Sequence, residues 1–114
     1  MTTDELLNIL DANTHNMTGF APEKLYTVVA SDLMSDVLTL EEEPDVLVTG
    51  LCNTQVIRTA EMADIPLVII AKGKRVSEEL IELAKEGEIS LISTDLSVYK
   101  CCGLLYSKGL KDVI

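Results

Sequence analysis

The chain has 114 residues, 47% of them hydrophobic and only 4% aromatic, so we expect one domain, spanning residues 1–114, with an aliphatic core. Nineteen acidic residues against nine basic ones give a net charge of −10, which disfavours nucleic acid and anionic membranes as partners. Residues 1–10 lack the basic start of a signal peptide, and no apolar run has membrane-spanning length. These features predict a soluble, cytoplasmic protein.

The N-terminal segment begins with a helix signal. Thr2 and Glu5 have the spacing of a capping box, and the apolar residues that follow fall on one helical face. Residues 13–22 are polar and end in proline, which predicts a loop with, at most, a short edge strand. His15 is then an exposed loop residue. Residues 25–30 are β-branched and apolar, which is typical of a strand.

A helix is predicted next, with Ser31 and Asp32 as its capping residues. Its buried stripe is predicted to consist of Leu33, Met34, Val37 and Leu38. Residues 45–49 form a strand whose continuous apolar run indicates burial on both faces. Residues 50–54 turn the chain into another helix, which buries Val56, Ile57, Ala60 and Ala63.

The second half of the chain repeats this alternation. Residues 66–71 are predicted to form a central strand, followed by a basic loop at 72–76. A helix then runs from a Ser77 cap to Gly87, and residues 89–93 form a short strand. The last helix is capped by Thr94 or Ser97 and runs to about Ser107.

Strands that alternate with helices at this spacing indicate right-handed crossovers. We therefore expect an α/β fold with a three-layer arrangement: a mainly parallel sheet of four or five strands with helices on both faces. In such sheets, ligands bind beyond the carboxyl ends of the strands. The residues predicted there as ligand-binding candidates are Ser31, Asp32, Asn53, Thr54, Lys72, Lys74, Arg75 and Thr94. Such residues also serve as ordinary helix caps and exposed turns.

Catalytic and metal-binding motifs are not found. The sequence has neither a P-loop nor a GxGxxG motif. Asp32 and Asp36 are spaced to share a helix face, which leaves an acid–base pair in a hydrolase or transferase as an alternative to a solvated face. His15 would need a distant partner such as Cys52 or Ser93 to form a catalytic pair. We expect no catalytic residue, no cofactor and no metal.

Cysteine usage fits a reducing environment. Cys52, Cys101 and Cys102 are odd in number and lack zinc-ligand spacing, so we expect reduced, packed thiols.

The last helix has more apolar residues than one buried stripe requires. Such an excess often marks a subunit interface, and two-fold dimers are the commonest assembly. We predict a homodimer whose interface includes Tyr99, Leu104 and Tyr106. Singly exposed apolar residues are the alternative explanation.

Two stretches of the chain resemble a known family. Residues 28–38 (VVASDLMSDVL) are similar to the ASDLLSDVM-type segment of stand-alone DRTGG-domain proteins. Residues 46–74, 77–85 and 93–109 resemble the second half of the same family in order and spacing. The resemblance implies a fold like the N-terminal domain of HPr kinase and the nucleotide-binding domain of Mur ligases. It also implies a regulatory or ligand-binding role rather than catalysis.

The motif that names this family is altered here. At its expected place the chain has Leu51-Cys52-Asn53-Thr54-Gln55, so the Asp, the Arg and both glycines are replaced. The leading hypothesis is a dimeric, non-catalytic regulatory module that senses a small anionic or nucleotide-like metabolite. The second is a protein-interaction subunit that docks on an enzyme complex through its last helix and acidic surface.

Overall fold

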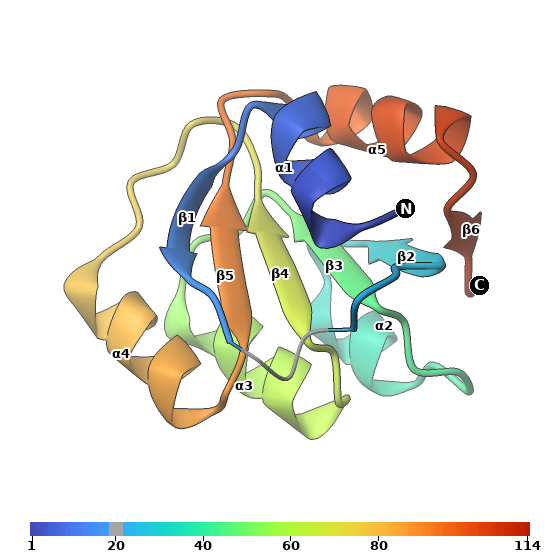
Figure 1. Ribbon diagram of the computed structural model, residues 1–114. Coiled ribbons are helices and arrows are strands. Elements are labelled where there is room, and N and C mark those ends of the chain that lie inside the picture. Colours follow the sequence, from blue (N-terminus) through green and yellow to red (C-terminus); the bar gives the residue numbers. More distant parts are fainter. Residues whose placement is uncertain (19–21) are drawn as a thin grey trace.

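The computed structural model describes residues 1–18 and 22–114. In these residues, one six-stranded sheet has the order β1-β5-β4-β3-β2-β6, with helices on both faces (Figure 1). The strands are β1 Asn13–Asn16, β2 Thr27–Ala30, β3 Val46–Thr49, β4 Leu67–Ile70, β5 Ser90–Ser93 and β6 Lys111–Asp112. The helices are α1 Thr3–Leu10, α2 Met34–Leu38, α3 Thr54–Met62, α4 Glu78–Glu86 and α5 Val98–Ser107.

The predicted α/β class with a mainly parallel sheet is confirmed. Only β1 runs antiparallel to its neighbour, β5, and the other neighbouring strands are parallel. The strand count exceeds the four or five expected because β6, which pairs with β2, is only two residues long. A two-residue strand has no alternation for a sequence pattern to reveal.

The sheet divides the core into two layers of side chains. Every residue of β3, β4 and β5 is buried. Because successive strand residues point to opposite faces, Leu47 joins one cluster while Val46 and Val48 join the other. Helices α2, α3 and α4 cover the first face, and α1 and α5 cover the second (Figure 1).

Most helix boundaries follow the predicted caps. The Thr2 hydroxyl accepts a hydrogen bond from the Glu5 N–H at 3.2 Å, as the capping box requires. Ser77 and Ser97 cap α4 and α5 in the same way, so Ser97 rather than Thr94 is the cap of the last helix. Gly87 is the C-terminal cap of α4, as predicted.

The second helix differs from its prediction. It begins at Met34 with Leu33 in the capping position and no side-chain cap, so Ser31 and Asp32 do not cap it. Within its predicted stripe, Met34 and Val37 are buried, but Leu33 and Leu38 are 59% and 46% exposed. The helix is only five residues long, so only the two side chains that face the sheet are buried.

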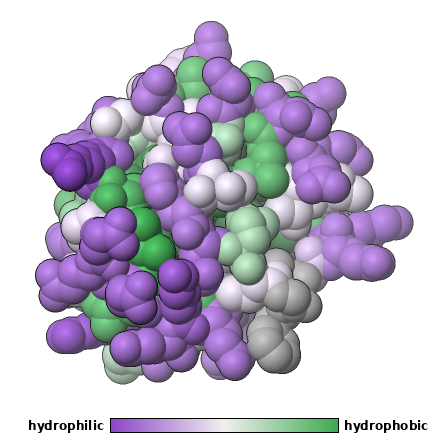
Figure 2. Space-filling model, turned by 60° about the vertical axis from the view of Figure 1, so that its left-hand side comes forward, coloured by the Kyte–Doolittle hydropathy of each residue, from purple (hydrophilic) through white to green (hydrophobic). Residues whose placement is uncertain are grey.

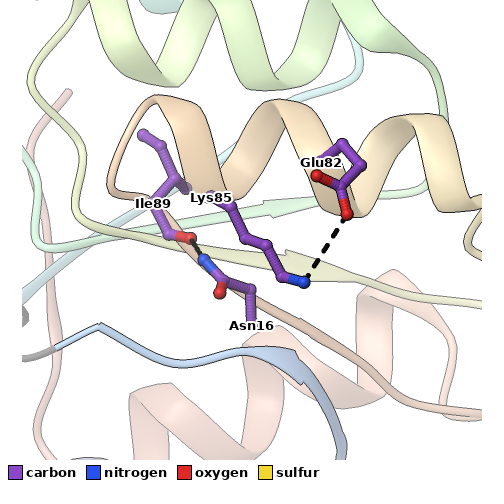
Figure 3. A network of polar contacts seen from close by, with 4 residues as sticks. All are labelled: Asn16, Glu82, Lys85 and Ile89. Carbon is purple, nitrogen blue, oxygen red and sulfur yellow. Dashed lines mark hydrogen bonds and ion pairs between the residues drawn. The ribbon is translucent and has the colours of Figure 1, made fainter.

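The predicted loop at 13–22 contains a strand, and His15 lies in it half-buried rather than exposed. Asn16 secures this edge of the sheet, because its side-chain amide donates a hydrogen bond to the Ile89 carbonyl at 2.7 Å (Figure 3). Beside it, Lys85 pairs with Glu82 on α4. Figure 2 shows this side of the molecule, where hydrophilic residues dominate and hydrophobic ones form separate patches. Residues 19–21 of the predicted loop lie outside the described residues.

Candidate functional site

The candidate ligand site lies where parallel strands β2, β3 and β4 end side by side. These strands are neighbours in the sheet and run in the same direction, so the loops that follow them meet at one edge. Asp32 follows β2, Gly50 follows β3, and Lys72 follows β4. The structure therefore brings together three of the loops that the sequence pattern singled out.

Asp32 links the first two loops. Its Oδ1 accepts hydrogen bonds from the Gly50 backbone N–H at 2.7 Å and from the Thr49 hydroxyl at 2.9 Å. The Thr49 hydroxyl in turn accepts a hydrogen bond from the Leu51 N–H at 3.2 Å. The Gly50 hydrogen bond, with smaller effects from Thr49, Lys72 and Lys74, lowers the pKa of Asp32, although partial burial opposes this.

Lys72 covers the start of the β3 loop. Its side chain lies against Gly50 so closely that a Cβ at position 50 would be 2.9 Å from the ammonium nitrogen. The backbone of Lys72 has a φ of 71°, in the left-handed region, and Gly73 follows with a φ of 65°. Their N–H groups donate to the carbonyls of Leu96 and Thr94, so this turn is fixed by the loop before α5.

The altered motif segment, residues 51–55, packs beside the basic loop. The Cys52 thiol donates a hydrogen bond to the Arg75 carbonyl at 3.3 Å, and burial raises the pKa of that thiol. Asn53 caps α3 by accepting a hydrogen bond from the Val56 N–H at 3.2 Å. The segment that replaces the family's motif is thus a helix start held against the Lys72–Arg75 loop, defined as residues 72–75.

The remaining predicted ligand residues differ in accessibility. Lys72, Lys74 and Arg75 are exposed, as is Asn53, and Thr54 is half-buried at the first position of α3. The Ser31 hydroxyl accepts a hydrogen bond from the Leu33 N–H.

Thr94 cannot contact a ligand as predicted. It is 1% exposed, and its hydroxyl donates to the Leu10 carbonyl at 2.6 Å. It lies at the predicted strand end, but its side chain turns inward to join α1 to β5.

Of the alternative catalytic pairs, the structure brings His15 and Ser93 together but does not place Asp32 and Asp36 on one helix face. Asp36 lies on α2 while Asp32 precedes that helix, so the two carboxylates do not share a helix face as the spacing suggested. His15 Nε2 does lie 2.7 Å from Ser93 Oγ, but His15 has no carboxylate partner among the hydrogen bonds of the described residues. A triad needs that third group to orient the imidazole. The His15–Ser93 contact therefore ties β1 to β5.

Two residues at this edge were not among the predicted ligand-binding candidates, although Asp95 belongs to one of the predicted strand ends. Thr49 is fully buried, and its hydroxyl joins Asp32 to the loop after β3. The only sequence feature that could have indicated this role is its position at the end of an apolar run. Asp95 lies next to the basic loop, because its Oδ1 is 3.1 Å from where a Cβ on Gly73 would stand.

No cluster of three or more potential metal ligands occurs among residues 1–18 and 22–114. In the same residues, no helix combines the length and apolar character needed to cross a bilayer.

A second feature, an apolar groove, lies along α5 beside strands β2 and β6. It has a volume of about 550 Å³. It is lined by Val28, Ala30, Tyr99, Lys100, Cys102, Gly103, Leu104, Tyr106, Leu110, Asp112 and Ile114. Of the predicted interface residues, Tyr99 and Tyr106 are 86% and 81% exposed, while Leu104 is half-buried and partly packed against the core. We call this feature the α5 groove.

Comparison with known proteins places the chain. A sequence model of the DRTGG domain matches residues 5–106, nearly the whole length. The chain belongs to the DRTGG domain family. No curated protein matches it significantly.

Among solved structures, this DRTGG domain is similar to the CBS and DRTGG domains of the regulatory region of Clostridium perfringens pyrophosphatase, complexed with its activator diadenosine tetraphosphate. The TM-score is 0.75 and the sequence identity 24%, over 91% of this chain. The chain spans 45% of that structure, so the similarity establishes a common fold for that part.

Proposed function

We propose that this DRTGG domain is a non-catalytic regulatory module that binds a small anionic, nucleotide-like metabolite at the carboxyl ends of β2, β3 and β4. We further propose that it acts as a homodimer. One observation carries the ligand proposal. The Lys72 side chain lies over Gly50, the residue that directly precedes the segment replacing the family's motif. Asp32 accepts a hydrogen bond from the N–H of the same glycine. Charged groups from the ends of β2 and β4 therefore flank the short loop that follows β3.

The comparisons support a regulatory role. The similar solved structure is the regulatory region of an enzyme, and it was crystallised with a nucleotide activator. This chain corresponds to less than half of that region, so we carry over only the class of ligand, a phosphorylated nucleotide. We also propose that the fold is related to that of the N-terminal domain of HPr kinase and of the nucleotide-binding domain of Mur ligases.

The geometry indicates how an anion would be recognised. In many phosphate sites, backbone N–H groups bind the ligand. Here the N–H of Gly50 already binds Asp32, and those of Lys72 and Gly73 already bind carbonyls. The positive charge for recognition is supplied by the side chains of the Lys72–Arg75 loop, which are exposed. Binding through exposed ammonium and guanidinium groups is electrostatic, so the affinity should fall steeply as salt is added.

The experiment measures binding of nucleotides and inorganic phosphate compounds by calorimetry and by thermal shift. Saturable binding should occur and should be lost in the variant Lys72→Ala, Lys74→Ala, Arg75→Ala. The matched control, Lys24→Ala, Lys85→Ala, Lys108→Ala, changes the net charge equally at exposed positions elsewhere and should bind normally. If no compound at millimolar concentration raises the melting temperature, the ligand proposal is wrong.

The second candidate function is a protein-interaction subunit, and the α5 groove favours it. Its two exposed tyrosines are of the residue type that dominates binding energy at interfaces. A cytoplasmic location is also proposed, supported by three cysteines that form no disulfide.

A further inference from the structure

The α5 groove contains a glycine that the fold of one chain does not explain. Gly103 lies in the middle of α5, where glycine weakens a helix relative to alanine. A Cβ at this position would meet nothing within 4 Å. The monomer would therefore accept any small side chain here. A missing side chain on an exposed helix face allows close approach of another molecule.

The residues around Gly103 form a symmetric stripe. Tyr99, Cys102, Gly103 and Tyr106 follow the spacing that places side chains on one face of a helix, and all four line the groove. The order large, small, small, large reads the same in both directions. A two-fold axis between positions 102 and 103 would set Tyr99 against Tyr106 of the partner subunit. An isologous interface requires such self-complementarity.

Resting on the dimer in the proposed function, we propose that a second copy of this chain occupies the groove, with the two α5 helices antiparallel and closest at Gly103. Cys102 and Gly103 of each copy then meet at the axis, with a tyrosine pair on either side of them. Antiparallel helices also align their dipoles favourably.

Charge favours the same orientation. Lys100 near the start of α5 and Asp112 in β6 both line the groove, and neither belongs to an ion pair among the described residues. In the antiparallel arrangement the start of one α5 lies beside the end of the other, close to the β6 that follows it. Lys100 of each copy thus approaches Asp112 of the partner subunit. Residues 98–114 contain three lysines and one aspartate, whereas the whole chain has a net charge of −10. Two acidic molecules repel each other least where they present this segment.

The experiment is sedimentation velocity on the full chain over a wide concentration range, without ligand. The wild type should be a closed dimer, and Gly103→Glu should be a monomer with an unchanged circular dichroism spectrum. Gly103→Ala should weaken association at least about tenfold, although alanine favours the helix. Lys108→Asp is the matched control; it is exposed, follows the same helix and does not line the groove.

Charge reversal tests the orientation. Lys100→Asp and Asp112→Lys should each weaken the dimer, and the double variant should recover most of the lost affinity. A wild type that stays monomeric, assemblies that grow beyond two copies, or a dimer unaffected by Gly103→Glu would each overturn the proposal. Ligand binding by the Gly103→Glu monomer is measured separately, because the ligand site is at the strand ends. Failure of the dimer and failure of the ligand site are therefore distinguishable.

Discussion

Asp32 Oδ1 accepts a hydrogen bond from the backbone N–H of Gly50 at 2.7 Å, so a side chain from the loop after β2 binds a backbone donor in the loop after β3. In a phosphate site the N–H of such a loop would bind the ligand. Here a carboxylate of the protein occupies that donor. This contact removes the Gly50 N–H as a donor for an anionic ligand and increases the importance of the lysines beside it.

Replacing Asp32 with alanine should destabilise the fold. The Thr49 hydroxyl and the Gly50 N–H, both in buried residues, would lose their acceptor, and an unsatisfied buried group costs about 1–3 kcal/mol. Urea denaturation measures the change. Asp36→Ala, which removes the same charge from an exposed side chain on α2, should be nearly neutral. Equal losses in the two variants would contradict the role of these hydrogen bonds.

The Asp32 contact should also make stability depend on pH. Because the pKa of Asp32 is lower in the folded protein than in the unfolded chain, the charged form stabilises the fold. This contribution is complete above the unfolded pKa, about 4, and is lost as pH falls through the lower folded pKa. The stability difference between wild type and Asp32→Asn should therefore be largest near neutral pH and shrink below about pH 4. If the stability difference between the two proteins grew as the pH fell, the pKa of Asp32 would be raised by folding and not lowered.

Gly50→Ala should weaken anion binding with little effect on folding. The new methyl group would displace the end of the Lys72 side chain, which is flexible, while the rest of the loop has no reason to move. Calorimetry with a nucleotide that binds the wild type measures the loss. In a Lys72→Ala background, the same substitution should have no further effect. If it weakens binding equally there, Gly50 acts through something other than Lys72.

Cys101 should be the least reactive thiol of the native protein. Burial raises its pKa to about 11, so at pH 8 roughly one thiol in a thousand is ionised. Single-cysteine variants that retain Cys52, Cys101 or Cys102 can be alkylated with iodoacetamide and followed by mass spectrometry. Cys101 should react slowest in native protein, and all three should react alike in denaturant. Fast native labelling of Cys101 would show that α5 opens readily.

The His15–Ser93 contact should prove structural. Ser93→Ala and His15→Ala should each reduce stability, and the double variant should lose less than the sum, with a coupling of about 1 kcal/mol. Ligand binding by the folded variants should not change, because this contact ties β1 to β5 at the far edge of the sheet. Purely additive losses would mean that the hydrogen bond contributes nothing.

Local patterns in the sequence were sufficient for the α/β class and the mainly parallel sheet, but not for β6. The four apolar runs are parallel strands in the sheet, and the three central ones, β3, β4 and β5, are buried on both faces as continuous apolar runs indicate. The caps Thr2 and Ser77 were predictable, and Ser97 was one of two predicted for the last helix, because each one bonds to a residue three positions away. Family membership followed from the order of these segments and is confirmed over residues 5–106.

The arrangement of the site depends on contacts between distant parts of the chain. Asp32 resembled a helix cap, yet it binds Gly50, eighteen residues away, because β2 and β3 pair in a register that sets Ala30 beside Val48. Thr94 lies in a polar segment typical of a ligand-binding loop, but its hydroxyl donates a hydrogen bond to the Leu10 carbonyl, 84 residues away. A local pattern encodes which conformation a segment prefers. The partner of a polar side chain is decided by which strands lie side by side, and that information appears only when the sheet has formed.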